Sequence, residues 1–286
     1  MTLRDRMAPG ELLVAPGVFD MISARIADRM GFGALYMTGY GTVASSLGLP
    51  DAGLASYTEM VQRVACIAGG TTTPVICDAD TGFGGLLNVD RTVRGYEAAG
   101  AAGIQIEDQV FPKKCGHTPG REVIPVEDMV RKIRVACEAR ASRDFLIVAR
   151  TDARTAHGID EALSRADAYA RAGADVLFVE SPEAEEEMAR ICRSFDLPCL
   201  ANMVEGGRTP LLTREELRQI GYRMAIFPAT GFLSAAEALS RAYGALRAQG
   251  SSKGAGLERF PFADMNTLMG FERVWEFDRS HAERPQ

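Results

Sequence analysis

The stretch 74–84 reads PVICDADTGFG, and it holds the pattern that decides the fold. Its first four residues are mostly apolar, and they lead directly into two acids and a glycine-rich turn. Strands that are buried on both faces carry such runs without polar alternation, so residues 74–77 predict a strand of a parallel sheet. Seven further runs of this kind occur along the chain: 12–15, 34–37, 103–106, 145–149, 175–179, 198–201 and 224–227.

Segments with helical periodicity separate these runs. They span 20–30, 58–68, 90–99, 126–140, 160–172 and 213–220. Thr213 with Glu216 three residues later is a capping-box pattern, and Gly100 after Ala99 is typical of a helix end. Eight strands that alternate with helices predict an α/β fold, a (β/α)8 TIM-type barrel. An open doubly wound sheet is the alternative, but the sequence has no GxGxxG or P-loop motif.

Composition narrows the class of protein. The 286 residues carry a formal net charge of −6, and 47% of them are hydrophobic, which is typical of a globular chain. The acidic balance argues against nucleic-acid or anionic-membrane partners. The first residues lack the apolar core of a secretory signal. The six cysteines are widely spaced without a CxxC motif, so we expect free thiols in a reducing compartment and a cytoplasmic protein.

The C-terminal part has a different composition. Residues 249–256 read QGSSKGAG, which predicts a flexible linker. We therefore expect a catalytic barrel domain over 1–248, and a linker with a helical segment over 249–286. An apolar stripe in that segment predicts packing on another subunit or on the barrel wall. It consists of Phe262, Met265, Leu268, Met269, Phe271 and Trp275.

Polar residues follow the predicted strands at the point where each one ends. They are Thr38 and Gly39, Asp78 and Asp80, Glu107 and Asp108, Arg150 and Asp152, Glu180, and Asn202 with Glu205. Catalytic groups of barrel enzymes lie at the carboxyl ends of the strands. Six successive strands that end in such residues therefore predict an active site.

Two aspartates and a glutamate in this set indicate a metal site. Asp78 and Asp80 lie two residues apart, so in an extended strand they point the same way, and Glu107 ends the next strand. Carboxylate oxygens suit a hard cation such as Mg2+, which also removes the repulsion between the two aspartates. The alternative is that both aspartates cap the following helix.

The segment 113–117 reads KKCGH and predicts a mobile, polar loop. Lys113, Lys114 and His117 surround Cys115 with cations, which favours an accessible thiolate. Such a loop near a metal site is typical of a lid that delivers an acid or base. A zinc site is one alternative, although no second Cys/His pair completes four ligands. An exposed loop with an incidental thiol is the other.

Two further features point to anionic ligands. The turn over 38–42, TGYGT, follows a strand, and its backbone N–H groups could bind a carboxylate or phosphate. Arg150 ends a buried strand and needs an anionic partner. That partner is a structural carboxylate such as Glu180, a substrate carboxylate, or both.

These motifs together resemble the isocitrate lyase / phosphoenolpyruvate mutase superfamily. The matching stretches are GLPD at 48–51, DADTGFG at 78–84, EDQ at 107–109, KKCGH at 113–117, ARTDA at 149–153 and ANMVEGG at 201–207. They run in family order along most of the predicted barrel. The KKCGH loop is the most specific of them, because it marks the lyase branch and some mutases.

The resemblance implies roles for individual residues. Asp51, Asp78, Asp80 and Glu107 match the family positions that hold the metal, partly through water molecules. The resemblance implies Mg2+ as the cofactor, with Mn2+ as a substitute. Substrate-binding positions match Thr38, Gly39, Tyr40, Gly116, His117, Arg150 and Asn202. Catalytic positions match Cys115, Lys113, His117, Arg150 and Glu180. The family also implies a homotetramer whose C-terminal helices swap between subunits.

The expected function is a Mg-dependent carbon–carbon lyase acting on a small carboxylic acid. Retro-aldol cleavage of a substituted malate or a methylisocitrate-type acid would pass through an enolate and release an oxoacid such as pyruvate. Cys115 is the predicted acid that protonates the enolate. The alternatives are a carboxyphosphonate mutase that acts on a P–C bond and an oxaloacetate hydrolase or decarboxylase. A binding module without activity needs neither the aspartate pair nor a thiol lid.

Overall fold

The computed structural model describes residues 2–116, 118, 120–254 and 256–282. Contacts between α-carbons divide the chain into two compact units, Met1–Phe232 and Leu233–Gln286. The predicted boundary after residue 248 falls at the end of the helix Thr230–Gln249. The contacts place the boundary after Phe232, within the first turn of the same helix. From Leu233 onward, the helix therefore belongs to the second unit.

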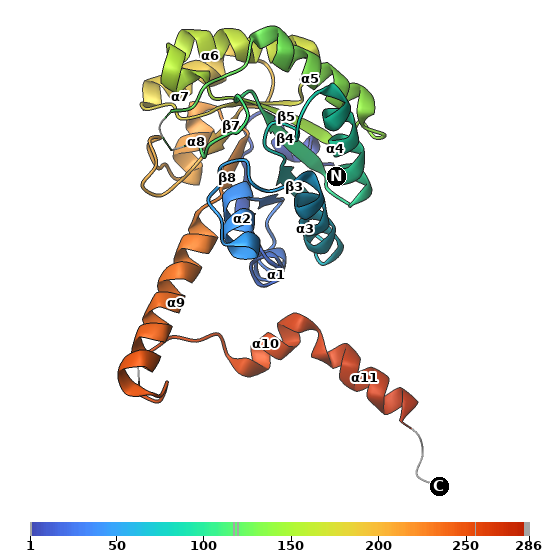
Figure 1. Cartoon of the computed structure of the whole chain (residues 1–286), viewed down its shortest axis with the longest axis vertical. Coiled ribbons are helices and arrows are strands. Elements are labelled where there is room, and N and C mark those ends of the chain that lie inside the picture. Colours follow the sequence, from blue (N-terminus) through green and yellow to red (C-terminus); the bar gives the residue numbers. More distant parts are fainter. Residues whose placement is uncertain (1, 117, 119, 255, 283–286) are drawn as a thin grey trace. The chain divides into compact units, whose positions relative to one another are not determined.

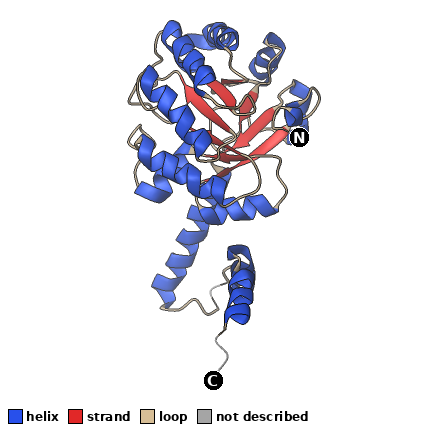
Figure 2. Cartoon of the chain, turned by 90° about the vertical axis from the view of Figure 1, so that its right-hand side faces the viewer, coloured by secondary structure: helices blue, strands red, loops and turns tan. Residues whose placement is uncertain are grey.

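The first unit is a barrel of parallel strands surrounded by helices (Figures 1 and 2). The strands are β1 (Leu13–Val18), β2 (Leu35–Met37), β3 (Val75–Asp78), β4 (Gly103–Glu107), β5 (Leu146–Thr151), β6 (Val176–Val179), β7 (Leu200–Asn202) and β8 (Met224–Phe227). Their order is β6-β5-β4-β3-β2-β1-β8-β7. A parallel bridge between Leu177 and Cys199 joins β6 to β7. The predicted TIM-type fold is confirmed.

The helices of this unit follow the strands and cover the outside of the barrel (Figure 1). They are α1 (Met21–Arg29), α2 (Gly39–Leu47), α3 (Tyr57–Gly69), α4 (Leu86–Ala98), α5 (Val126–Ala139), α6 (Ala153–Ala172), α7 (Glu185–Ser194) and α8 (Arg214–Ile220). The predicted Thr213–Glu216 capping box is present at α8. The helix predicted over 160–172 is the second part of α6, which kinks at Gly158, where φ is 83°.

Alternation along the strands decides which side chains enter the barrel. Val75 and Cys77 of β3 join the outer core under the helices, whereas Ile76 joins the inner core. Tyr36, Val148, Phe178 and Leu200 are inner residues of their strands in the same way. Because side chains alternate with a period of two, the residue two positions later also points inward. These positions are Thr38, Asp78, Arg150, Glu180 and Asn202, all at the carboxyl ends of strands.

The second unit is helical. It contains most of α9 (Thr230–Gln249), followed by α10 (Phe262–Met269) and α11 (Phe271–His281). In the predicted apolar stripe, Leu268 is buried, while Phe262 is 82% exposed and Trp275 is 46% exposed. The expected packing of this stripe on a second subunit stays a prediction.

Two further expectations concern the whole chain. The six cysteines, all of which lie among the described residues, are thiols that form no disulfide. Within the described part of the chain, none of the helices has the length and the apolar character needed to cross a membrane.

Candidate active site

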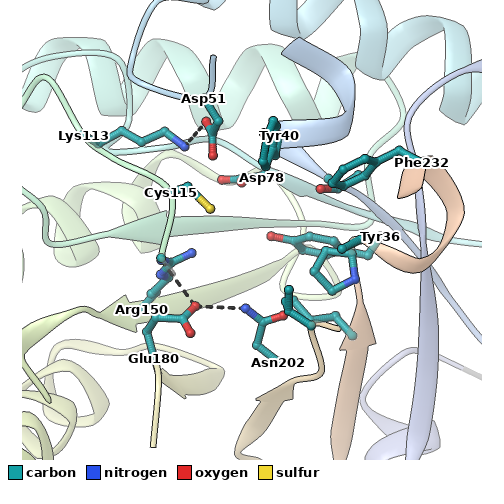
Figure 3. A pocket seen from close by; sticks show the side chains of 16 residues that line it. Tyr36, Tyr40, Asp51, Asp78, Lys113, Cys115, Arg150, Glu180, Asn202 and Phe232 are labelled. Atoms are coloured by element: carbon teal, nitrogen blue, oxygen red, sulfur yellow. Dashed lines mark hydrogen bonds and ion pairs between the residues drawn. The ribbon is translucent and has the colours of Figure 1, made fainter. Parts of the chain in front are cut away.

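A cavity opens at the carboxyl ends of the strands (Figure 3). Most of the predicted site residues line it, and they come from strand ends and from the loops that follow them. The predicted residues on its wall are Thr38, Tyr40, Asp51, Asp78, Lys113, Cys115, Gly116, Arg150, Glu180 and Asn202. The chain therefore brings together side chains that are up to 164 residues apart in sequence, from Thr38 to Asn202.

Three predicted residues lie behind this wall, and one lies outside the described residues. Asp80 and Glu107 are buried next to residues that line the cavity. A Cβ atom on Gly39 would lie 2.4 Å from Oδ2 of Asp78, so the α2 backbone packs directly on that carboxylate. His117 is outside the described residues, and its predicted role stays a prediction.

Arg150 is the centre of a buried ionic network. Its guanidinium donates to both carboxylate oxygens of Asp152 at 2.9 Å, and it lies 3.3 Å from Glu107 and from Glu180. Burial opposes the charge of Arg150, but Asp152, Glu107 and Glu180 outweigh it and raise the arginine's pKa well above its usual value. Arg150 therefore stays cationic, and Glu180 is a structural partner as predicted.

Asp152 is shared between two arginines. Besides Arg150, it accepts a 2.7 Å hydrogen bond from Arg121. Burial alone would raise the pKa of Asp152, but the two guanidinium groups have the larger effect and hold this pKa below its usual value. Asp152 thus compensates the charge of Arg150 and fixes its orientation in the wall of the cavity.

Glu180 joins two neighbouring strands. One of its oxygens accepts a 3.0 Å hydrogen bond from the amide of Asn202, and the other accepts a 2.8 Å bond from the backbone N–H of Ser181. Ser181 has φ of 59°, in the left-handed region, so the chain turns sharply after β6. This turn directs the Glu180 carboxylate toward Arg150 and Asn202 (Figure 3).

Lys113 lies between two aspartates. Its ammonium contacts Oδ1 of Asp51 and lies 2.8 Å from Oδ1 of Asp80. Burial lowers the pKa of Lys113, but the attraction of Asp80 and Asp51 outweighs burial and holds it well above its usual value. Burial raises the pKa of Asp80 to about 6, even though Lys113 lowers it. The prediction placed Lys113 beside the thiol, and the structure pairs it with the acids.

Asp78 is held by a second series of hydrogen bonds. Tyr36 donates to Gln105 at 2.6 Å, and Gln105 donates to Oδ1 of Asp78 at 3.3 Å. The backbone N–H of Asp80 also donates to Oδ1 of Asp78, at 3.0 Å. Burial raises the pKa of Asp78. With Oδ1 engaged in this way, Asp78 presents Oδ2 to the Gly39 side of the cavity.

The acidic residues fit a hydrated divalent cation by their chemistry. Four carboxylates, Asp51, Asp78, Asp80 and Glu107, lie around two cations, Lys113 and Arg150, within a buried region. The described residues contain no group of three or more Asp, Glu, His or Cys arranged to hold a metal directly. Mg2+ keeps several waters and takes few protein ligands, so it does not require such a group. An oxygen-only donor set with excess negative charge suits it.

The loop that carries Cys115 is fastened on both sides. The side chain of Gln109 accepts from the backbone N–H of Lys114 at 2.9 Å and donates to its carbonyl oxygen at 2.8 Å. Beyond Cys115, the carbonyl oxygen of Gly116 accepts a 3.1 Å bond from Ser181. A Cβ atom on Gly116 would lie 2.4 Å from Nη2 of Arg150. The loop is therefore closed over the site, and only glycine fits at 116.

The start of α2 faces the same cavity. Thr38 is the residue before the helix, and among the described residues its side chain makes no capping hydrogen bond. Thr38 and Tyr40 line the cavity. A helix N-terminus without a side-chain cap offers backbone N–H groups to an anion. This geometry agrees with the predicted carboxylate-binding turn.

Several lining residues were missed by the sequence analysis. They are Tyr36, Val204, Ile226, Pro228, Ala229 and Phe232. Tyr36 and Ile226 sit at inward positions of β2 and β8, so strand alternation could have indicated them. Phe232 carried no such signal, because it lies in the first turn of α9, for which no helix was predicted.

Comparisons with known proteins agree on one group. A family model described as phosphoenolpyruvate phosphomutase matches residues 3–247. The chain is 50% identical to a 2,3-dimethylmalate lyase of Eubacterium barkeri, over 98% of this chain and 97% of the relative. It is 42% identical to a 2-methylisocitrate lyase of Aeropyrum pernix, over 99% and 90%.

Solved structures extend the comparison. An oxaloacetate acetylhydrolase in complex with the inhibitor 3,3-difluorooxalacetate superimposes with a TM-score of 0.92 at 35% identity, covering 100% of this chain and 97% of that one. A phosphonopyruvate hydrolase in complex with oxalate and Mg2+ gives a TM-score of 0.88 at 28% identity, covering 99% and 100%. Two of these four proteins are named as lyases, and two as hydrolases.

Proposed function

This chain belongs to the phosphoenolpyruvate phosphomutase family, within the isocitrate lyase / PEP mutase superfamily, and from that premise we propose that it cleaves a substituted malate. It is a carbon–carbon lyase, as its similar relatives are. One observation carries the proposal for the substrate. The thiol of Cys115 lines the same cavity as Arg150 and Asn202, so a proton donor lies beside groups that can bind a carboxylate.

The proposed reaction is a retro-aldol cleavage. The hydroxyl of the substrate loses its proton to a base, and its carbon becomes the carbonyl carbon of an oxoacid such as pyruvate. The bond between this carbon and its neighbour breaks, and the electron pair moves into the carboxylate of the second fragment as an enolate. A proton is then added to the carbon of that enolate, which gives a second, saturated acid.

Each side chain of the cavity has a proposed part in this reaction. Cys115 donates the proton to the enolate carbon. Arg150 and Asn202 bind the carboxylate of the fragment that becomes the enolate, and Glu180 keeps both of them in place. The backbone at Thr38, Gly39 and Tyr40 binds the carboxylate of the fragment that becomes the oxoacid. Closure of the loop over the site excludes water, which would otherwise compete as the proton donor.

The proposed cofactor is Mg2+, with Mn2+ as a possible substitute. Asp51, Asp78, Asp80 and Glu107 would hold it, partly through water. When bound, such an ion stabilises negative charge on the hydroxyl oxygen and its neighbouring carboxylate. Support for this comes from the excess of buried carboxylates and from the Mg2+ in the related phosphonopyruvate hydrolase. Lys113 stays a proposed catalytic residue because it lines the cavity, and its ammonium also compensates the charge of Asp51 and Asp80.

A substrate panel tests the proposal. Purified enzyme with Mg2+ is incubated separately with malate, citramalate, 2,3-dimethylmalate, 2-methylisocitrate and oxaloacetate, and the oxoacid that forms is identified by mass spectrometry. We expect pyruvate from the methylated malates, and no product after chelation of the metal. If no hydroxy acid is cleaved, the lyase proposal for a substituted malate is wrong.

Two other reactions are outcomes of the same panel. The family contains a 38% identical carboxyvinyl-carboxyphosphonate phosphorylmutase of Arabidopsis thaliana, so turnover of a phosphonate alone would favour a mutase. Oxalate formed from oxaloacetate would favour the hydrolase, which the similarity to oxaloacetate acetylhydrolase makes the second candidate.

The predicted homotetramer also stays a proposal. The second unit exposes apolar side chains such as Phe262 and Phe277, which are 82% and 59% exposed. Exposed aromatic side chains of this size are typical of surfaces that pack on another subunit. Light scattering on the purified protein would give the mass of the assembly.

A further inference from the structure

The turn that follows β3 holds Asp80 in an unusual backbone conformation. Four of the five residues from Asp80 to Gly84 have positive φ, and two of them, Asp80 at 49° and Phe83 at 57°, are not glycine. Residues with a side chain adopt this left-handed region only where the surrounding structure holds them there. The contacts that hold the turn therefore decide where the Asp80 carboxylate lies.

Two neighbouring helices hold this turn from the outside of the barrel. They are α4 and α5, which lie side by side (Figure 1). From α5, the ammonium of the half-buried Lys132 donates a 2.7 Å hydrogen bond to the carbonyl oxygen of Thr81. From α4, the hydroxyl of Thr92 donates to the carbonyl oxygen of Gly82 at 3.3 Å. The contact from Lys132 is the shorter of the two, and a charged donor makes a stronger hydrogen bond than a neutral one.

We propose that Lys132 is a positioning residue, which fixes the turn after β3 and thereby keeps the Asp80 carboxylate beside Asp78 for the cation. Lys132 does not line the cavity, so it would act on the site through the backbone of the turn. This inference rests on the proposed Mg2+ site and adds a residue that supports it from outside the barrel.

The turn controls two of the carboxylates that we propose for the metal. The carboxylate of Asp80 lies 2.8 Å from Lys113, and the backbone N–H of Asp80 donates to Oδ1 of Asp78 at 3.0 Å. Without the ammonium of Lys132, the buried carbonyl of Thr81 loses this partner, and the turn can relax toward negative φ at Asp80. Such a rotation would move both the Asp80 carboxylate and the N–H that holds Asp78.

The charge of Lys132 alone predicts the opposite effect on the metal. An ammonium repels a cation, so a purely electrostatic role means that Mg2+ binds more tightly once Lys132 is neutralised. A positioning role means that Mg2+ binds more weakly, because groups that hold metal ligands in place contribute roughly 10- to 100-fold to metal affinity. The direction of the change in Kd therefore separates the two roles.

Titration calorimetry with MgCl2 on the metal-free full-length protein measures this direction. The Kd for Mg2+ should rise roughly 10- to 100-fold in Lys132→Met. Lys132→Arg keeps a charged donor, and its Kd should stay within about 3-fold of wild type. Arg134→Met, at an exposed position two residues further along α5, is the matched control and should leave the Kd unchanged.

Thermal unfolding separates positioning from a general loss of stability. Each protein is unfolded once with a chelator and once at a fixed concentration of Mg2+. A merely structural role of Lys132 would lower Tm equally in both conditions. A positioning role reduces the rise in Tm that Mg2+ causes, because a ligand stabilises the folded state according to its concentration relative to its Kd.

The remaining outcomes also decide. An equal or lower Kd in Lys132→Met overturns the inference, and so does a Kd in Lys132→Arg as high as that in Lys132→Met. If Lys132→Met does not fold, Lys132→Gln takes its place, and if neither folds, Lys132 serves the fold rather than the site and the inference is wrong.

The same titration separates this inference from the function beneath it. If the wild-type protein binds no Mg2+, the proposed cofactor is wrong, and the inference fails with it. The titration contains no substrate, so a substrate panel that yields no oxoacid would leave its result unaffected.

Discussion

The side chain of Gln109 makes both backbone hydrogen bonds of Lys114, one to its N–H and one to its carbonyl oxygen. Gln109 thus acts as a neighbouring strand would, although it is a single side chain. Its amide also donates to Oε1 of Glu107 at 3.0 Å. The closed loop is therefore connected to an acidic residue that we propose as a metal-holding group.

Replacing Gln109 should open this loop. Gln109→Leu removes the two hydrogen bonds to Lys114, each worth about 1 kcal/mol net, so the equilibrium constant for loop closure falls at least about 10-fold. We expect kcat to fall by a similar factor, and trypsin to cut after Lys113 or Lys114 faster than in wild type. Gln219→Leu on the exposed face of α8 is the control. If kcat and the rate of tryptic cleavage are unchanged in Gln109→Leu, Gln109 does not hold the loop closed.

Replacing Cys115 tests the proposed acid. Cys115→Ser and Cys115→Ala should lower kcat by roughly 10²- to 10⁴-fold, the range for loss of a general acid. The affinity for Mg2+, measured by titration calorimetry, should not change, because the thiol is no ligand in this proposal. The exposed Cys66, changed to Ala, is the matched control. Full activity of Cys115→Ala on the preferred substrate would show that another group supplies the proton.

Gly116 leaves no room for a side chain. In Gly116→Ala the new Cβ would lie 2.4 Å from Nη2 of Arg150 and 2.9 Å from Glu180, both fixed by buried contacts. We expect a drop in kcat/KM of at least about 10-fold, since a misplacement of about 1 Å can cost about 100-fold. Gly69→Ala, on α3 with open space around the new atom, should leave kinetics unchanged. Equal kinetics for the two variants would mean that the loop does not close during turnover.

Asp80 gives the metal-free protein a characteristic pH dependence. Burial raises the pKa of Asp80 from 3.8 to about 6, so between these pH values the folded protein holds a proton that the unfolded chain has released. Unfolding therefore releases a proton, and this contribution to stability is complete below pH 3.8 and lost as the pH rises through about 6. Asp78 and Glu107, whose pKa values burial also raises, act in the same direction.

Urea unfolding with a chelator, from pH 4.5 to pH 7.5, measures this effect. The free energy of unfolding of wild type should fall with rising pH relative to Asp80→Asn, by an amount on the order of 2 kcal/mol. The buried neutral amide of the variant does not titrate in this range. Parallel curves for the two proteins would exclude a raised pKa of Asp80.

Most of the barrel could be predicted because its signals are local. Runs of apolar residues mark the strands, and by strand alternation the polar residue that follows several of these runs points inward. This is why the amino-acid sequence alone indicates Asp78, Arg150, Glu180 and Asn202 as site residues. Caps such as Thr213 with Glu216 are equally local, because both groups lie within one turn.

The parts of the site that were not predicted depend on contacts between segments that are distant in sequence. Lys113 was predicted beside the thiol that follows it by two residues, yet its ammonium lies between Asp51 and Asp80. Nothing in the local sequence relates positions 51 and 113, because the closure of the barrel brings them together. Phe232 was missed for the same reason, since it reaches the cavity from the first turn of α9.

The weak connection between β6 and β7 has a consequence for the stability of the barrel. In the described part of the chain these two strands share the Leu177–Cys199 bridge rather than a ladder, and the hydrogen bond from Asn202 to Glu180 spans them at the rim. A molecule bound to Arg150 of β5 and Asn202 of β7 would connect these two strands across β6, and would therefore span the junction that has no ladder. The same few contacts would then contribute both to the affinity for the bound molecule and to the stability of the barrel. We therefore expect the enzyme with this molecule bound to unfold at a higher temperature than the enzyme without it.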